Sequence, residues 1–105
     1  MNIILFHNHF DAKHLENVTA QMQNLGAPTI KAVWMECFNA WVALEGCHRI
    51  RAAYSLGLTP EIDEIEYSET ETLNSIGVEH DCDEDYTIAS ICDDAYANDM
   101  IEFED

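Results

Sequence analysis

Residues 40–53 of the chain read Ala-Trp-Val-Ala-Leu-Glu-Gly-Cys-His-Arg-Ile-Arg-Ala-Ala. The apolar residues 41–44 predict a buried strand, and the residues after Gly46 predict a helix that ends at Gly57. A strand that passes through a glycine into a helix leaves backbone N–H groups without acceptors at the helix start. These groups and the helix dipole favour a bound anion. The sequence therefore predicts an anion site at the Gly46 turn.

Side chains at this turn are suited to two kinds of chemistry. Cys47 is a candidate catalytic nucleophile, because a helix N-terminus and a nearby arginine lower the pKa of a thiol. Donors that match phosphate oxygens make four residues of this turn candidates for binding nucleotide or phosphate: Gly46, His48, Arg49 and Arg51. Lys13, on the first turn of the helix expected at 12–25, is a fifth candidate, which the family resemblance given below implies. Structural alternatives stay open. Cys47 could pack as a small residue, Arg49 could pair with Glu45, and Lys13 and His48 could be ordinary surface side chains.

The flanking sequence predicts further strands and helices from its apolar periodicity. In chain order they are a strand at 3–6, a helix at 12–25, strands at 29–35 and 40–45 joined by a hairpin, the helix at 47–56 and a strand at 61–67. Asp11 is the expected N-cap of the first helix and Gly26 its stop. In the last third, 69–76 could form a short helix, 80–85 is an acidic loop, and 86–100 predict a helix docked on the core.

The resulting fold class is α+β, a small mixed sheet with packed helices and an acidic, partly helical C-terminal extension. We expect residues 1–67 to form the core and 68–105 to pack on it, within one domain.

The order of elements over residues 10–67 is similar to the sulfiredoxin/ParB-like superfamily. Gly46-Cys47-His48-Arg49 resembles the sulfiredoxin turn that cradles ATP phosphates and carries the catalytic cysteine. Residues 46–53 equally resemble the Gly-x-x-Arg-x-Arg-Ala-Ala box of ParB-type nucleotide-binding domains. Asp11-Ala12-Lys13 resembles the segment whose lysine reaches the nucleotide, and 28–34 resemble the strand that follows.

This resemblance implies a function and a cofactor. The implied ligand is ATP or another nucleotide with Mg²⁺, and the implied chemistry is thiol chemistry or phosphotransfer at Cys47. Two features depart from the family. Glu45 stands where sulfiredoxins usually have a second glycine, so a carboxylate lies beside the expected phosphate cradle. The acidic last third matches neither branch.

The net charge of −17 is concentrated in one half of the chain. Residues 1–60 hold four acids and all four bases, whereas residues 61–105 hold 17 acids and no lysine or arginine. Such a charge opposes direct binding to duplex DNA. It suggests a second function from a different class: a non-catalytic interaction or inhibitor protein that binds a basic partner protein. A nucleic-acid charge mimic of the phage or mobile-element type is one form that such a protein can take. The expected contact residues are Asp81, Asp83, Asp85, Asp93, Asp94 and Asp99. A solvated acidic surface that only aids solubility is the alternative.

Other patterns exclude several classes of site. The four cysteines form no Cys-x-x-Cys pair, and the spacing at 81–85 fails as a calcium loop because Tyr86 occupies the glycine position. We therefore expect no protein-bound metal. No apolar run approaches the roughly 20 residues of a membrane span, and the first residues lack the features of a secretory signal. The expected location is cytoplasmic, with no membrane partner.

Overall fold

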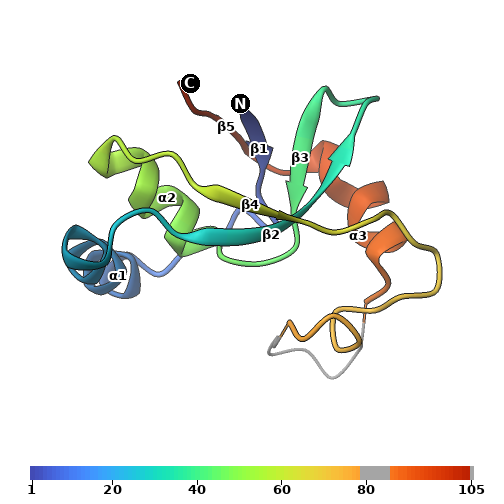
Figure 1. The fold of residues 1–105 in the computed structure, drawn as a ribbon, viewed down its shortest axis with the longest axis horizontal. Coiled ribbons are helices and arrows are strands. Elements are labelled where there is room, and N and C mark those ends of the chain that lie inside the picture. Colours follow the sequence, from blue (N-terminus) through green and yellow to red (C-terminus); the bar gives the residue numbers. More distant parts are fainter. Residues whose placement is uncertain (79–85, 105) are drawn as a thin grey trace.

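The structure, a computed structural model, describes residues 1–78 and 86–104. Five strands form one mixed sheet in the order β4-β2-β3-β1-β5 (Figure 1). The strands are β1 (Asn2–Ile4), β2 (Thr29–Met35), β3 (Ala40–Ala43), β4 (Glu61–Glu64) and β5 (Met100–Glu102). The helices are α1 (Ala12–Leu25), α2 (Cys47–Leu56) and α3 (Ile88–Asp94), followed by a 3₁₀ turn, η1 (Ala95–Ala97). The predicted α+β class is confirmed.

The hairpin of β2 and β3 lies in the middle of the sheet. These strands are antiparallel, with Trp34 opposite Trp41 and their rings edge to face at 5.4 Å. Each strand has a parallel neighbour on its outer side, since β4 pairs with β2 and β1 pairs with β3. Parallel neighbours require crossover connections, and α1 and α2 lie within them. The predicted hairpin between 30–35 and 40–45 is confirmed.

The helices cover the two faces of the sheet and bury a separate apolar cluster on each. Figure 1 shows α1 and α2 on one side of the sheet and α3 on the other. Ile3, Ile30 and Ile50 are fully buried in the cluster on the side of α1 and α2, and Val42, Leu73 and Ile88 are fully buried in the cluster on the side of α3. The helix start at Gly46 therefore lies at the end of a central strand, between the sheet and α1.

The predicted helix over 86–100 is wrong in its second half. The helix ends at Asp94, the 3₁₀ turn ends at Ala97, and Asn98 is extended. The Asn98 side chain donates hydrogen bonds of 3.0 Å to the carbonyl oxygens of Leu5 and Phe6. These bonds attach the chain beside β1, where β5 then pairs antiparallel.

The segment before α3 also differs from the prediction. Residues 69–76 form turns and no helix, and Thr72 makes a single bridge to Thr87. Leu73 and Val78 from this segment are buried against the sheet. The predicted acidic loop at 80–85 lies outside the described residues.

Candidate functional site

The Gly46 turn has the conformation that the strand-to-helix transition predicts. Gly46 is the N-cap of α2 in the left-handed region, with φ of 74°. A β-carbon at this position would lie 2.6 Å from Cδ1 of Ile30 and 3.0 Å from Nη2 of Arg49. Glycine is therefore required both by the backbone angle and by the side chains packed over it. The predicted helix start at Gly46 is confirmed.

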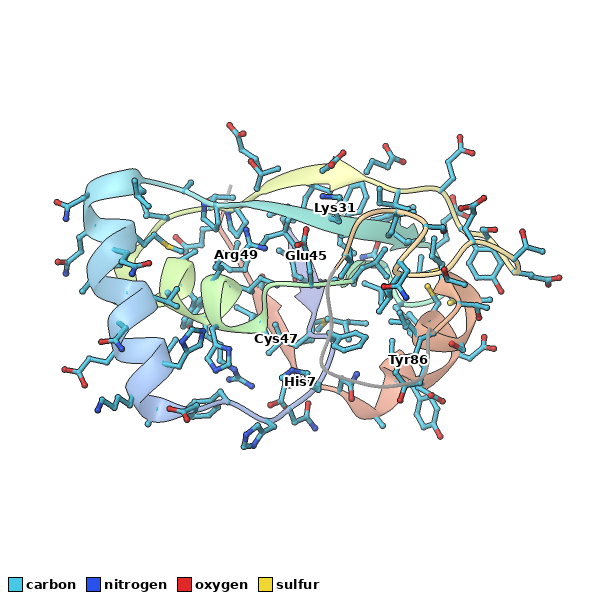
Figure 2. The ribbon with its side chains drawn as sticks, turned by 90° about the horizontal axis from the view of Figure 1, so that it is seen from below. His7, Lys31, Glu45, Cys47, Arg49 and Tyr86 are labelled. Carbon is cyan, nitrogen blue, oxygen red and sulfur yellow. The ribbon has the colours of Figure 1, made fainter. Side chains whose placement is uncertain are left out.

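Glu45 and Arg49 form an ion pair across this turn (Figure 2). Nη2 of Arg49 donates to Oε1 of Glu45 at 3.1 Å, and Nη1 donates to the carbonyl oxygen of Thr29 at 3.2 Å. The second carboxylate oxygen of Glu45 accepts from the backbone N–H of Lys31 at 3.2 Å and lies 3.8 Å from its Nζ. A carboxylate of the chain itself thus takes the place beside Arg49 that a phosphate would need.

Arg51 extends from the same helix toward the opposite edge of the sheet. Its Nη2 donates to the carbonyl oxygen of Asn8 at 3.2 Å and lies 3.4 Å from the carboxylate of Asp99. The guanidinium stacks over the ring of Phe10 at 4.7 Å. Only 19% of the side chain is exposed. Arg51 therefore joins the loop after β1 to the residues before β5, rather than pointing with Arg49 at one ligand.

Cys47 is buried, with 5% of the residue exposed. Burial raises the pKa of its thiol, against the lowering effect of the backbone N–H groups of His7 and Phe6. The predicted lowering of this pKa is wrong, because removal of water from the thiolate outweighs the favourable dipoles. The structure fits the alternative in which Cys47 packs as a small residue in a tight turn.

His48 and Lys13 lie where α1 and α2 begin. Nε2 of His48 accepts the backbone N–H of Asp11 at 3.0 Å, and its ring meets that of His14 edge to face at 4.6 Å. Desolvation, followed by the charge of His14, lowers the pKa of His48. The imidazole is thus held neutral with its Nε2 used as an acceptor. Lys13 is exposed on the first turn of α1 and forms no ion pair with the described residues.

The residues at this turn do not fit a nucleotide phosphate in the arrangement described. The two arginines are brought onto one helix, but each is bonded to a carboxylate of the chain itself. A phosphate beside Arg49 would meet the negative charge of Glu45 and would have to displace it. Internal contacts therefore occupy the guanidinium groups of both arginines, and Lys13 on α1 is the exposed cation among the predicted phosphate-binding residues.

The described acids of the C-terminal half are all exposed. They are Glu61, Asp63, Glu64, Glu66, Glu69, Glu71, Asp93, Asp94, Asp99, Glu102 and Glu104. Among described residues, only two of them lie within ion-pairing distance of a lysine or arginine: Asp63, 4.0 Å from Lys31, and Asp99. By contrast, Glu45 of the N-terminal half has 22% of its side chain exposed and lies within ion-pairing distance of both Lys31 and Arg49. The surface of this half therefore presents carboxylates with few internal counter-charges.

An aromatic side chain lies among these acids. Tyr67 is 46% exposed, and desolvation, together with the charges of Asp93 and Glu69, raises the pKa of its phenol. The backbone N–H of Ala89 donates to the carbonyl oxygen of Ser68 at 2.9 Å, which joins the chain beside Tyr67 to α3. We call Tyr67, Glu69 and Asp93 the Tyr67 patch.

The predicted partner-binding residues fall into three groups. Asp93 and Asp94 are exposed on α3, as predicted. Asp99 is not on the helix and pairs with Arg51, because the chain turns away after Ala97. Asp81, Asp83 and Asp85 lie outside the described residues.

Tyr67 and Glu69 were not among the predicted site residues. A usable signal exists in the sequence, because Tyr67 is the single aromatic residue within an acid-rich run from 61 to 71. No family model, curated protein or solved structure matches this chain. No helix among the described residues is long and apolar enough to cross a bilayer.

Proposed function

We propose that this chain is a non-catalytic interaction protein whose acidic surface binds a basic surface of another protein. The observation that carries the proposal is the distribution of ion pairs. Arg49, Arg51 and Lys31 are bonded to carboxylates of the chain itself, whereas the described acids of the C-terminal half are exposed and, apart from Asp63 and Asp99, have no described lysine or arginine within ion-pairing distance. A surface with this excess of carboxylates attracts lysine and arginine side chains over long range and repels nucleic acid.

The Tyr67 patch is the part of this surface best suited to a specific contact. The carboxylates of Glu69 and Asp93 can accept hydrogen bonds from a guanidinium, and the exposed ring of Tyr67 can stack against it. Proteins that bind nucleic acid carry arginines and lysines for phosphate contacts. The partner class is therefore a basic, nucleic-acid-binding protein, and the acids act as a charge mimic of the phosphates.

We infer that the scaffold is related to the sulfiredoxin/ParB-like fold. The order of strands and helices through β4 and the glycine at the start of α2 support this inference. Binding of ATP or another nucleotide with Mg²⁺ stays a prediction from the same resemblance. The ion pair of Glu45 with Arg49 and the burial of Cys47 argue against it.

A comparison of two probes tests the proposed function. Calorimetric titrations would use an arginine-rich peptide of about ten residues, and ATP or CTP with Mg²⁺ at about millimolar concentration. We expect the peptide to bind and both nucleotides to give no binding heat. Nucleotide binding without peptide binding would overturn the proposal in favour of the phosphate site.

Paired variants test whether the Tyr67 patch contributes. Glu69→Gln with Asp93→Asn removes two carboxylates from the patch, and Glu16→Gln with Glu36→Gln removes two exposed carboxylates from the N-terminal half. Exposed charge pairs contribute about 0.2–1 kcal/mol each. We therefore expect the patch variant to bind the arginine-rich peptide about three- to tenfold more weakly, and the control to change affinity by less than about twofold. Equal losses in both variants would remove the patch from the proposal.

A further inference from the structure

The strand β5 has an outer edge that no described residue pairs with. Leu5 donates from its backbone N–H to Asp99 at 2.8 Å, Phe103 donates to Met1 at 2.7 Å, and Ile101 lies opposite Ile3. In an antiparallel pair, alternate residues direct their N–H and C=O groups toward the partner strand. The backbone groups of residues 99, 101 and 103 therefore face β1, and those of Met100 and Glu102 point away from the sheet. Figure 1 shows β5 at the edge of the sheet, next to β1.

The other edge of the sheet is protected against pairing in a way that β5 is not. Three of the four residues of β4 are exposed acids, Glu61, Asp63 and Glu64. Charged side chains along an edge strand oppose the addition of another strand. In β5 only Glu102 is charged, and Met100 beside it is 53% exposed. The strand β5 itself thus has one charged residue, against three in β4, and its edge is less protected against the addition of a strand.

The two faces of this edge differ in chemistry. Ile101 and Phe103 belong to the apolar cluster beneath α1 and α2, and Tyr54 of α2 meets the ring of Phe103 edge to face at 5.9 Å. Because side chains alternate along a strand, Met100 and Glu102 lie on the opposite face. The side chains of Ile101 and Phe103, which face α2, are thus apolar, and Glu102 carries its carboxylate between them along the strand.

Two hollows follow the edge on the side of α2. Phe10, Tyr54 and Ile101 are among the residues that line the first, of about 430 Å³. Tyr54, Leu58 and Phe103 are among those that line the second, of about 480 Å³. Charged residues border both hollows: Arg51 and Glu102 the first, and Glu102 and Glu104 the second. Tyr54 is 60% exposed between the two hollows. Both hollows therefore adjoin β5 on the side of α2.

We propose that the outer edge of β5 pairs with an extended, basic segment of the partner protein. Backbone hydrogen bonds form to Met100 and Glu102, alternate apolar side chains enter the hollows beside Tyr54, and the intervening lysines or arginines lie on the face of Glu102. Charge selects this occupant, because Glu102 and Glu104 are exposed and residues 61–105 contain no lysine or arginine. A second copy of the chain would bring the same carboxylates together. This inference rests on the proposed function and adds the mode of recognition.

A peptide of about seven residues that alternates valine and lysine is the probe, since strands of this length are typical. The first comparison peptide has the same composition in two blocks, and the second is N-methylated at alternate residues, which removes donors for strand pairing. Fluorescence anisotropy would give the affinities. We expect both comparison peptides to bind at least about tenfold more weakly than the alternating peptide.

Two substitutions test the location. Met100→Pro removes the outward N–H without removing a bond to β1, and Glu102→Lys reverses the charge on the exposed face. The matched control is Glu61→Lys on the opposite edge of the sheet. We expect each β5 variant to lose about tenfold in affinity for the alternating peptide and the control to lose less than about threefold.

Amide exchange of the wild-type chain, followed by NMR, gives a measurement that does not depend on the folding of any variant. Peptide binding should slow exchange at the amides of Met100 and Glu102. Binding of all three peptides with equal affinity, or exchange at these amides that peptide leaves unchanged, would overturn the strand-pairing inference while leaving the acidic interaction function in place. Failure of every basic peptide to bind would instead refute the proposed function. A wild-type dimer in sedimentation that Met100→Pro dissociates would assign the edge to a second copy and overturn the inference.

Discussion

Glu45 links α2 to β2 through one carboxylate. It pairs with Arg49 on α2, accepts the backbone N–H of Lys31 on β2, and lies near the ammonium of Lys31. Substitution of glycine at this position would leave Arg49 without its carboxylate and would open the helix start to an external anion. The charge that distinguishes this chain from the sulfiredoxin pattern is therefore the one that closes the predicted phosphate site.

The packing over Gly46 predicts a stability difference between two glycine substitutions. Gly46→Ala and Gly57→Ala both place a β-carbon at positive φ, which costs about 1–2 kcal/mol. At Gly57 the new methyl meets open space, whereas at Gly46 it meets the buried Ile30 and the guanidinium of Arg49. We expect Gly46→Ala to lower the free energy of unfolding by about 1–3 kcal/mol more than Gly57→Ala in urea titrations. Equal losses would show that the turn relaxes freely.

The burial of Cys47 predicts the order of thiol reactivity. Cys37 is exposed, Cys47 is buried with a raised pKa, and desolvation, followed by the charge of Asp93, raises the pKa of Cys92 to about 11. Alkylation of the native protein near neutral pH, with mass-spectrometric detection, should therefore modify Cys37 well before Cys47 or Cys92. Denatured protein is the control, in which the three should react alike. Faster labelling of native Cys47 would restore it as a candidate nucleophile.

The contacts of His48 predict a loss of stability on mild acidification. Its pKa is below the ordinary 6.5 in the folded state, so the unfolded chain binds the proton more tightly. The free energy of unfolding should fall as the pH drops through 6.5, until the folded-state pKa is also passed. His48→Gln should reduce this dependence, as measured by thermal unfolding between about pH 7.5 and about pH 5.5. Asp11 adds a separate pH dependence at lower pH, because the backbone N–H of His14 holds the pKa of its carboxyl below 3.8 in the folded state. The free energy of unfolding therefore falls further as this carboxyl is protonated. Identical dependence of stability on pH in the wild type and in His48→Gln would contradict the hydrogen bond from the backbone N–H of Asp11 to His48.

Local patterns predicted the elements around Gly46, while long-range contacts determined those at the C-terminus. The hairpin and the two long helices follow from apolar periodicity, with Asp11 and Gly57 at the expected caps. β5 has only three residues, and it forms because Asn98 and Phe103 attach it to residues more than ninety positions away. Alternation of Ile101 and Phe103 with acids was the available signal for it. The internal pairing of the arginines could not be deduced, since Asp99 and Arg51 are far apart in sequence.

The position of β5 predicts that the C-terminal strand is part of the core rather than an appendage. Phe103 is 5% exposed and packs with Ile3 and Leu5 in the cluster beneath α1 and α2. Phe103→Ala should lower the free energy of unfolding by about 3–5 kcal/mol. The exposed Met100 provides the control, and Met100→Ala should cost less than about 1 kcal/mol. A similarly small effect of Phe103→Ala in urea titrations would mean that the strand is dispensable.

Across the whole molecule, the charges are segregated by half rather than interspersed. The N-terminal half supplies every lysine and arginine, and the described residues of the C-terminal half place all their carboxylates at the surface. Self-repulsion among so many acids opposes folding, so both layers of helices must supply enough apolar burial to offset it. Under the proposed function, we expect a basic partner to relieve this repulsion when it binds.

The salt dependence of binding tests the central claim most directly. Fluorescence anisotropy would follow a labelled arginine-rich peptide of about ten residues with the full chain, from about 50 to about 300 mM salt. We expect the affinity to fall at least about tenfold over this range, with a shallower fall for Glu69→Gln combined with Asp93→Asn. An affinity that is independent of salt, or the absence of binding even at the lowest salt concentration, would contradict the account of this chain as an acidic interaction protein.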